Sequence, residues 1–171
     1  DLNLKSPFFL TQALHGALRA AASAQRPAKV INIASVDGMR PNPWHTYSYQ
    51  ASKAGLIHLT RRLAAGLISD HIVVSAIAPG AFASDMNRAA RDHGDVAALA
   101  IPSGRIGTDE DMAGAAIFLA SRAGDYVVGE TLTVDGEQLL RVGVQSVIEA
   151  TLVHGIFHGD MHAGNVLIDD D

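Results

Sequence analysis

The sequence predicts an α/β protein in which helices pack on both faces of a doubly wound parallel sheet. Two observations predict it. Three short runs rich in β-branched residues lie at 29–34, 71–77 and 130–134. Longer segments with apolar residues spaced three or four positions apart precede and separate these runs. Strands that alternate with helices form a parallel sheet with right-handed crossovers, and the order βαβαβ is half of such a sheet.

The first predicted helix covers residues 3 to about 24, because leucines and alanines between Leu10 and Ala21 follow helical spacing. Gln25-Arg26-Pro27 ends it, since proline cannot continue the backbone hydrogen bonds of a helix. The first strand, 29–34, is followed by a loop rich in Gly, Pro and Asn. This pattern is typical of a buried parallel strand.

A second long helix is predicted from about Tyr49 to Ser69. The second strand, 71–77, follows it until Pro79-Gly80 breaks the run. Residues 81–107 then mix turn signals with short helical pieces. We expect this segment to form a flexible lid.

Thr108 is predicted to cap a third helix that runs to about Ser121, since three acidic residues in its first turn suit the helix dipole. Strand 130–134 completes the sheet. The pattern then changes to a helix, a loop rich in His and Asp, and a short apolar strand. We therefore expect two domains, a sheet domain over 1–136 and a short helix-loop-strand tail over 137–171.

Composition and charge exclude several classes of function. The 171 residues include 18 acidic and 13 basic ones, the formal charge is −5, and the longest basic run is Arg61-Arg62. A nucleic-acid partner is therefore not expected. There is no cysteine, and polar residues interrupt every apolar run before the roughly 18 positions that a membrane helix needs. We expect a cytoplasmic protein with no membrane partner. Because the chain starts at Asp1 inside a helical pattern, we interpret it as a fragment or a rearranged product.

Three residues form a candidate catalytic group. Tyr49 and Lys53 are four positions apart in the second predicted helix, so their side chains lie on one face, one turn apart. A free tyrosine hydroxyl exchanges protons poorly at neutral pH, but a nearby cation favours the phenolate and makes it a usable general acid or base. Ser35 follows the first strand, at the carboxyl edge where such sheets bind ligands. Its hydroxyl could hold a substrate carbonyl.

This group resembles the catalytic motif of short-chain dehydrogenases/reductases, in which a Ser precedes a Tyr-x-x-x-Lys at a similar spacing; here Ser35 precedes Tyr49 by fourteen residues. By this resemblance, residues 1–136 correspond to the carboxyl-terminal, catalytic half of a Rossmann-like oxidoreductase. Four further features follow in the family's order: Asn3, Pro79-Gly80-Ala81-Phe82-Ala83-Ser84, Gly104-Arg105-Ile106-Gly107, and Gly129 with Val134-Asp135-Gly136.

The resemblance implies hydride transfer between NAD or NADP and a small-molecule carbonyl or alcohol, such as a 3-oxoacyl thioester or a secondary alcohol. Tyr49 would be the proton donor and Ser35 would polarise the carbonyl. Lys53 would favour the Tyr49 phenolate and bond the nicotinamide ribose, and Asn3 would hold a water for proton relay. The loop after the second strand would contact the nicotinamide carboxamide and the pyrophosphate through Pro79, Gly80, Phe82 and Ser84.

Plainer interpretations of these residues stay open. Tyr49 and Lys53 could be the start of an ordinary amphipathic helix, and Asn3 an ordinary helix residue. Ser84 could be a simple turn or cap residue. Tyr47 is not a candidate, because no lysine stands four positions after it.

No Gly-x-x-x-Gly-x-Gly turn occurs in the sequence, and such a turn opens the helix that holds the pyrophosphate in dinucleotide-binding folds. We therefore expect weak affinity for NAD or NADP and an open, apolar sheet edge at 29–34. The two long helices carry more apolar surface than one copy can bury, and related enzymes pair such helices between subunits. We expect a homo-oligomer.

The tail carries a second candidate site. Asp160 and Asn165 stand five residues apart, the spacing at which kinase catalytic loops place a carboxylate for the attacking hydroxyl and an amide oxygen for Mg²⁺. The stretch from about Gly143 resembles the catalytic loop of ubiquinone-biosynthesis-type atypical kinases. That resemblance implies ATP and Mg²⁺ as ligands, with Asp160 as base and Asn165 as metal ligand. Because a kinase also needs a nucleotide-gripping Lys and a Gly-rich cover, which this stretch lacks, we do not expect kinase activity.

Two further interpretations of the tail are adventitious metal binding and a solvated extension. Imidazole and carboxylate ligands suit Zn²⁺ and Ni²⁺, but we assign no metal site. A third hypothesis for the whole chain is a non-catalytic association module. The metal interpretation rests on four residues: His154, His158, Asp160 and His162.

Overall fold

A parallel sheet forms the centre of the computed structural model, which describes residues 2–85 and 87–136. These residues belong to one compact unit, Asp1–Glu137. The sheet has three strands in the order β1-β2-β3 within the described residues. The strands are β1 (Ala28–Ile33), β2 (Ile72–Pro79) and β3 (Thr131–Val134).

The register brings the carboxyl ends of the three strands to one edge of the sheet. Ile33 near the end of β1 pairs with Ile77 of β2, and Ile77 pairs with Leu132 of β3. Any residue that directly follows β1, β2 or β3 therefore lies at this edge, where open α/β sheets bind ligands. The predicted parallel sheet is confirmed, and its strand boundaries differ from the prediction by one or two residues.

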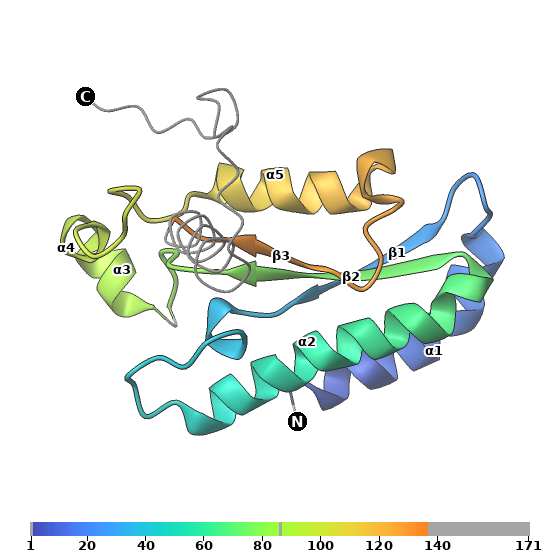
Figure 1. Cartoon of the computed structure of the whole chain (residues 1–171), viewed down its shortest axis with the longest axis horizontal. Helices are drawn as coiled ribbons and strands as arrows, with labels where there is room; N and C mark the ends of the chain where they lie inside the picture. The colour runs from blue at the N-terminus through green and yellow to red at the C-terminus, as the bar shows by residue number, and fades with distance from the viewer. Residues whose placement is uncertain (1, 86, 137–171) are drawn as a thin grey trace, which may run out of the picture. The chain divides into compact units, whose positions relative to one another are not determined.

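Helices cover both faces of the sheet, as the prediction of a doubly wound fold requires. Figure 1 shows α1 and α2 on one face and α5 on the other. Short helices α3 and α4 fill the segment predicted as a lid. The helices are α1 (Lys5–Ala21), α2 (Tyr47–Leu67), α3 (Arg88–Asp92), α4 (Gly94–Ala98) and α5 (Asp109–Ala120), and the 3₁₀ turns are η1 (Val36–Gly38), η2 (Ile68–Asp70) and η3 (Arg122–Gly124).

The core lies between β2 and the helices. Every residue of β2 is buried except Pro79 at its end, which explains why this run lacks the alternation of a half-exposed strand. Leu56 of α2 is buried within the described residues. One polar pair crosses the core, because the Asn32 amide donates to the Thr60 hydroxyl at 2.9 Å. Hydrogen bonding removes most of the cost of burying both groups.

Strand β1 is an edge strand within the described residues, because it pairs only with β2 there. The amides of Ala28 and Ala34 donate to the β2 side. Since backbone groups alternate in direction along a strand, those of Lys29, Ile31 and Ile33 point away from β2. A groove of about 400 Å³ lies between this edge and α1.

Two helix boundaries bear on the site. Thr108 caps α5 in a capping box with Asp111, as predicted. The first helix begins at Lys5, so the prediction that Asn3 lies inside it is wrong; Asn3 precedes the helix. None of the helices described here is long and apolar enough to cross a membrane.

Candidate active site

Ser35 lies at the carboxyl edge of the sheet, directly after β1. Its side chain is buried, and its hydroxyl accepts a hydrogen bond from the Asp37 amide at 3.2 Å. This bond makes Ser35 the cap of the 3₁₀ turn η1 and fixes the direction of the side chain. The Ser35 O–H proton is left free to donate to another group.

Tyr49 and Lys53 lie on one face of α2, in its first two turns, as their spacing predicts. The Lys53 ammonium lies 5.7 Å from the centroid of the Tyr49 ring. It also donates a hydrogen bond of 2.7 Å to the carbonyl of Ile33 at the end of β1. Lys53 therefore joins α2 to the end of β1, two residues before Ser35.

Gly38 allows the loop after Ser35 to touch α2. A Cβ atom at this position would lie 2.6 Å from the Lys53 carbonyl carbon and 2.7 Å from the Ala54 nitrogen. Only glycine permits this approach without a shift of the backbone. The close packing sets the distance between the Ser35 loop and the Tyr49–Lys53 turn.

Asn3 reaches the same part of α2 although it lies outside a helix. Its amide donates to the Ser52 hydroxyl at 3.2 Å, and the Ser52 hydroxyl donates to the Tyr49 carbonyl at 2.7 Å. The structure thus brings Asn3 beside the Tyr-x-x-x-Lys segment. Ser52 was not identified from the sequence, and its position inside the motif was the available signal.

The loop after β2 starts from a fixed point and then leaves the sheet. The Gly80 amide donates to the Val134 carbonyl at 2.9 Å, which ties Gly80 to the end of β3. Phe82 forms an isolated parallel bridge with Gly107. The Ser84 hydroxyl accepts a hydrogen bond from the Asn87 amide at 3.0 Å. In this structure the Ser84 hydroxyl therefore caps the turn that leads into α3, as the plainer interpretation of this residue expects.

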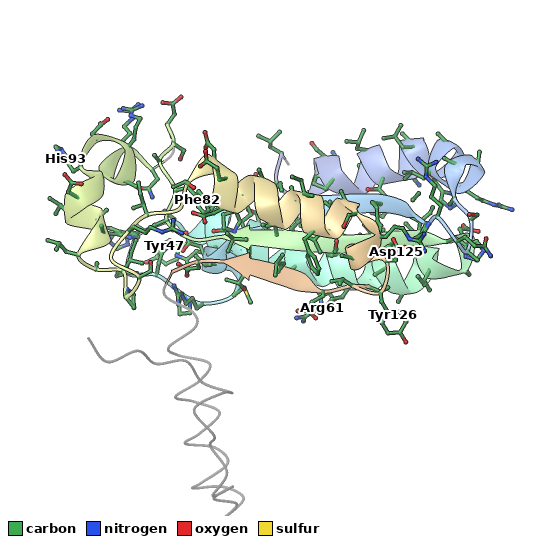
Figure 2. All side chains as sticks on the ribbon, turned by 90° about the horizontal axis from the view of Figure 1, so that it is seen from above. Tyr47, Arg61, Phe82, His93, Asp125 and Tyr126 are labelled. Carbon is green, nitrogen blue, oxygen red and sulfur yellow. The ribbon has the colours of Figure 1, made fainter. Side chains whose placement is uncertain are left out.

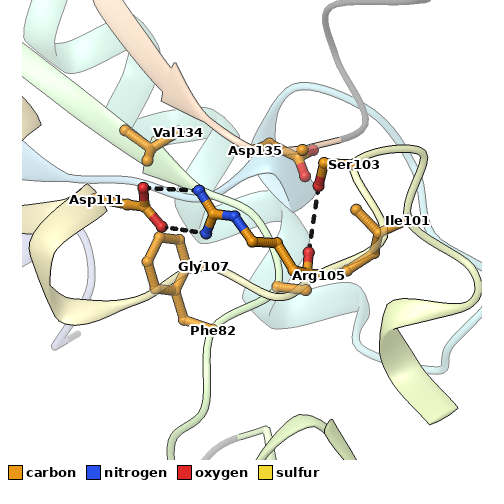
Figure 3. A pocket seen from close by; sticks show the side chains of 10 residues that line it. Phe82, Ile101, Ser103, Arg105, Gly107, Asp111, Val134 and Asp135 are labelled. Carbon is orange, nitrogen blue, oxygen red and sulfur yellow. Dashed lines mark hydrogen bonds and ion pairs between the residues drawn. The ribbon is translucent and has the colours of Figure 1, made fainter. Parts of the chain in front are cut away.

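A small cavity lies beside this loop, between Phe82, Arg105 and Asp135 (Figure 3). Its volume is about 210 Å³, below the roughly 300–1,000 Å³ of typical small-molecule pockets. By itself it is too small for a dinucleotide. Arg105 donates two hydrogen bonds to Asp111, at 2.5 and 3.0 Å, and this guanidinium holds the pKa of Asp111 below its usual range.

The candidate residues gather at one end of the sheet. Figure 2 shows Phe82 and Tyr47 at that end, with Asp125 and Tyr126 at the opposite end. No group of three or more His, Cys, Asp or Glu residues in 2–85 and 87–136 could hold a metal ion. Asp160, Asn165 and the tail histidines lie outside the described residues.

Burial lowers the pKa of Lys53 below its ordinary value of 10.5. In the unfolded chain the ammonium is hydrated and the pKa returns to that value, so the folded state binds fewer protons between the two pKa values. Stability therefore rises as the pH rises through the folded pKa, and the cost of burying the ammonium is fully present below it.

Lys53→Met removes this cost. We predict that the free energy of unfolding of the variant, relative to that of the unsubstituted chain, is highest at neutral pH and falls as the pH approaches 10.5. Urea unfolding of both proteins at a series of pH values measures it. A difference that stays constant over this range would show that burial does not perturb Lys53.

Comparisons with known proteins give two family matches. A family model described as enoyl-(acyl carrier protein) reductase matches residues 1–136. A second model, described as an ABC1 atypical kinase-like domain, matches residues 110–171. The second match lies mostly beyond the described residues, so the roles that the resemblance implies for Asp160 and Asn165 are not tested.

Curated relatives match the sheet domain. The rhamnolipids biosynthesis 3-oxoacyl-[acyl-carrier-protein] reductase of Pseudomonas aeruginosa is 46% identical over 139 residues, which cover 80% of this chain and 54% of that protein. The 2-dehydro-3-deoxy-D-gluconate 5-dehydrogenase of Dickeya dadantii is 40% identical over 148 residues, which cover 82% of this chain and 55% of that protein. The chain spans about half the length of the curated relatives it matches.

A solved structure shares the fold. The RhlG/NADP active-site complex of Pseudomonas aeruginosa matches with a TM-score of 0.75 and 43% identity, covering 79% of this chain and 56% of that chain.

Proposed function

The chain belongs to the short-chain dehydrogenase/reductase family, and from this premise we propose that it carries the proton-transfer and substrate-positioning groups of an NADP- or NAD-dependent carbonyl reductase. The observation that carries the proposal is the placement of the Lys53 ammonium over the Tyr49 ring while it binds the strand end before Ser35. These contacts support the proposal because they join the proposed proton donor and its cation to the strand end that precedes Ser35.

The donors present fit the nicotinamide ribose better than the rest of the coenzyme. Lys53 has three N–H donors and uses one of them on the Ile33 carbonyl in the described part of the chain. The remaining donors suit ribose hydroxyls. For the pyrophosphate, by contrast, the sequence offers no Gly-x-x-x-Gly-x-Gly turn.

In the proposed mechanism, the coenzyme supplies a hydride to the substrate carbonyl carbon when it is bound. The Ser35 hydroxyl donates a hydrogen bond to the carbonyl oxygen and orients it. Tyr49 donates its phenolic proton to the same oxygen, which yields the alcohol. The Lys53 ammonium stabilises the phenolate that remains, and Asn3 holds the water that returns the proton to Tyr49.

The proposed substrate is a small carbonyl compound or the matching secondary alcohol. The names of the two curated relatives above give a 3-oxoacyl-[acyl-carrier-protein] and 2-dehydro-3-deoxy-D-gluconate as the compounds that those proteins act on. The proposed contacts of the coenzyme are Tyr49, Lys53, Pro79, Gly80, Phe82 and Ser84.

The experiment joins this chain in frame to the part of the Pseudomonas aeruginosa 3-oxoacyl-[acyl-carrier-protein] reductase that lies outside the 139 matched residues. We call this protein the extended chain. NADPH or NADH oxidation is followed with a 3-oxoacyl thioester and a panel of ketones, and turnover supports the proposal. If the extended chain folds and binds NADPH but reduces none of these carbonyls, the proposed function is wrong.

We also propose that the protein forms a dimer or larger assembly through α1. Phe9, Leu10 and Leu14 of this helix are exposed, and a contiguous apolar face of this kind marks a protein interface. Sedimentation at micromolar concentration should show a species of at least twice the monomer mass. Leu10→Glu should shift it toward the monomer, whereas Leu99→Glu, at an exposed leucine outside α1, should not. A monomeric unsubstituted chain would contradict the proposal.

A further inference from the structure

We propose that the ion pair between Arg40 and Asp135 is a positioning device that holds the Ser35 loop and the Gly80 loop in one arrangement. The inference deepens the proposed function and rests on it, because these two loops carry the proposed carbonyl-binding and coenzyme-binding groups. Neither Arg40 nor Asp135 contacts the reacting atoms in the proposed mechanism. Both act through the loops that they join.

The pair connects distant parts of the chain at the carboxyl edge of the sheet. The Arg40 guanidinium lies 3.0 Å from the Asp135 carboxylate, across 95 positions of sequence. The Asp135 side chain is only 5% exposed and that of Arg40 is 28% exposed. A carboxylate so buried is costly without a counter-charge, and the Arg40 guanidinium supplies one.

The same carboxylate packs against the backbone of Gly80. A Cβ atom at position 80 would lie 2.3 Å from Asp135 Oδ1 and 2.5 Å from its carboxyl carbon. Asp135 is therefore in direct contact with the loop that the proposal assigns to the nicotinamide. One side chain thus touches Gly80 on one side and binds Arg40 on the other.

A second contact holds the neighbouring residues together. The Thr133 hydroxyl donates a weak hydrogen bond of 3.5 Å to the Met39 sulfur. Met39 directly precedes Arg40, and Thr133 lies two residues before Asp135. Ser35 precedes this anchor by a few residues, and Tyr49 follows it after an exposed loop. Arg40 is therefore the charged anchor of the segment between the two proposed catalytic hydroxyls.

Trp44 provides a probe of this segment without any labelling. It is the only tryptophan of the chain, it lies in the loop between Arg40 and Tyr49, and its side chain is 70% exposed. Its fluorescence anisotropy decay reports nanosecond motion of the loop. The measurement uses the 171-residue protein and needs no catalytic activity.

Asp135→Asn keeps the shape that packs on Gly80 and removes the charge. We expect it to about double the share of Trp44 anisotropy that is lost on the nanosecond timescale. Arg40→Met should also raise this share, and the double variant should change it by less than the sum of the two single variants, because both substitutions remove the same ion pair. Additive effects, or an unchanged decay in Asp135→Asn, would overturn the proposal.

The matched control is the ion pair between Lys29 and Asp125, whose atoms lie 2.8 Å apart and whose side chains are 14% and 30% exposed. Figure 2 shows Asp125 at the end of the sheet opposite Phe82 and Tyr47. Asp125→Asn should leave the Trp44 decay unchanged even where it lowers the midpoint of urea unfolding. An equal Trp44 response in this variant would mean that Trp44 senses overall stability, and the positioning role would fail.

Kinetics of the extended chain separate this inference from the proposed function. Asp135→Asn should lower kcat by about tenfold or more while KM changes less, since small misplacements of catalytic groups cost up to about a hundredfold. An unchanged kcat in a chain that turns over would overturn the positioning role alone. If even the unsubstituted extended chain reduces no carbonyl, the proposed function fails, and the Trp44 measurements still decide whether the pair holds the loop.

Discussion

In the extended chain, Tyr49→Phe is expected to lower kcat for carbonyl reduction by about 10²- to 10⁴-fold, the usual contribution of a positioned general acid. The substitution removes one oxygen from a half-buried ring and leaves the Lys53 ammonium beside the ring. Coenzyme affinity should therefore change little. Steady-state oxidation of NADPH gives kcat, and quenching of coenzyme fluorescence gives the dissociation constant.

Tyr47→Phe is the matched control for this substitution. Tyr47 lies in the same turn of α2, but its side chain is 72% exposed and its hydroxyl is 3.2 Å from His45. No lysine stands four positions after it. This variant should keep kcat within about twofold, as surface substitutions commonly do. If the two variants lose activity equally, Tyr49 has no special role in proton transfer.

Much of the sheet could be predicted because its strands carry strong local signals. β2 is a short run that is apolar except for Ser75 and ends at Pro79. Its length, its β-branched residues and the Pro-Gly at its end favour a strand buried on both faces over a helix. Helix ends were harder to predict. Asn3 was expected inside a helix that begins only at Lys5, because helical spacing of apolar residues gives no information on where the backbone first turns.

For the proposed catalytic group, too, only some of the contacts could be predicted from the sequence. The relation of Tyr49 to Lys53 follows from helix geometry alone, so the sequence predicts it. The bond from Lys53 to the Ile33 carbonyl depends on how α2 packs against β1, and the partner of Arg40 depends on where β3 ends. No local pattern encodes which of several acidic residues will face Arg40 across 95 positions. Such contacts become visible only when the tertiary structure is known.

In the proposed mechanism, the catalytic group and the coenzyme anchors contribute separately to hydride transfer. Tyr49, Lys53 and Ser35 would act only when a hydride donor lies within about 3–3.5 Å of the carbonyl carbon, and such positioning can contribute about 7–11 kcal/mol to the lowering of the barrier. In the described residues, β1 leaves one edge open toward the groove beside α1. The cavity beside the Gly80 loop holds only about 210 Å³. Neither feature provides a cradle for a pyrophosphate.

We therefore predict that the 171-residue polypeptide, expressed by itself, shows little or no reduction of ketones by NADPH or NADH. Its circular dichroism should nevertheless show the folded α/β domain. We expect the extended chain to recover turnover if the added part supplies a strand that pairs with the open edge of β1 and a Gly-rich turn that binds the pyrophosphate. Adding that part as a separate polypeptide tests whether pairing at the β1 edge is enough to assemble the two. Turnover by the 171 residues alone that disappears in Tyr49→Phe would show that Lys53 and the Gly80 loop bind the coenzyme productively without those anchors.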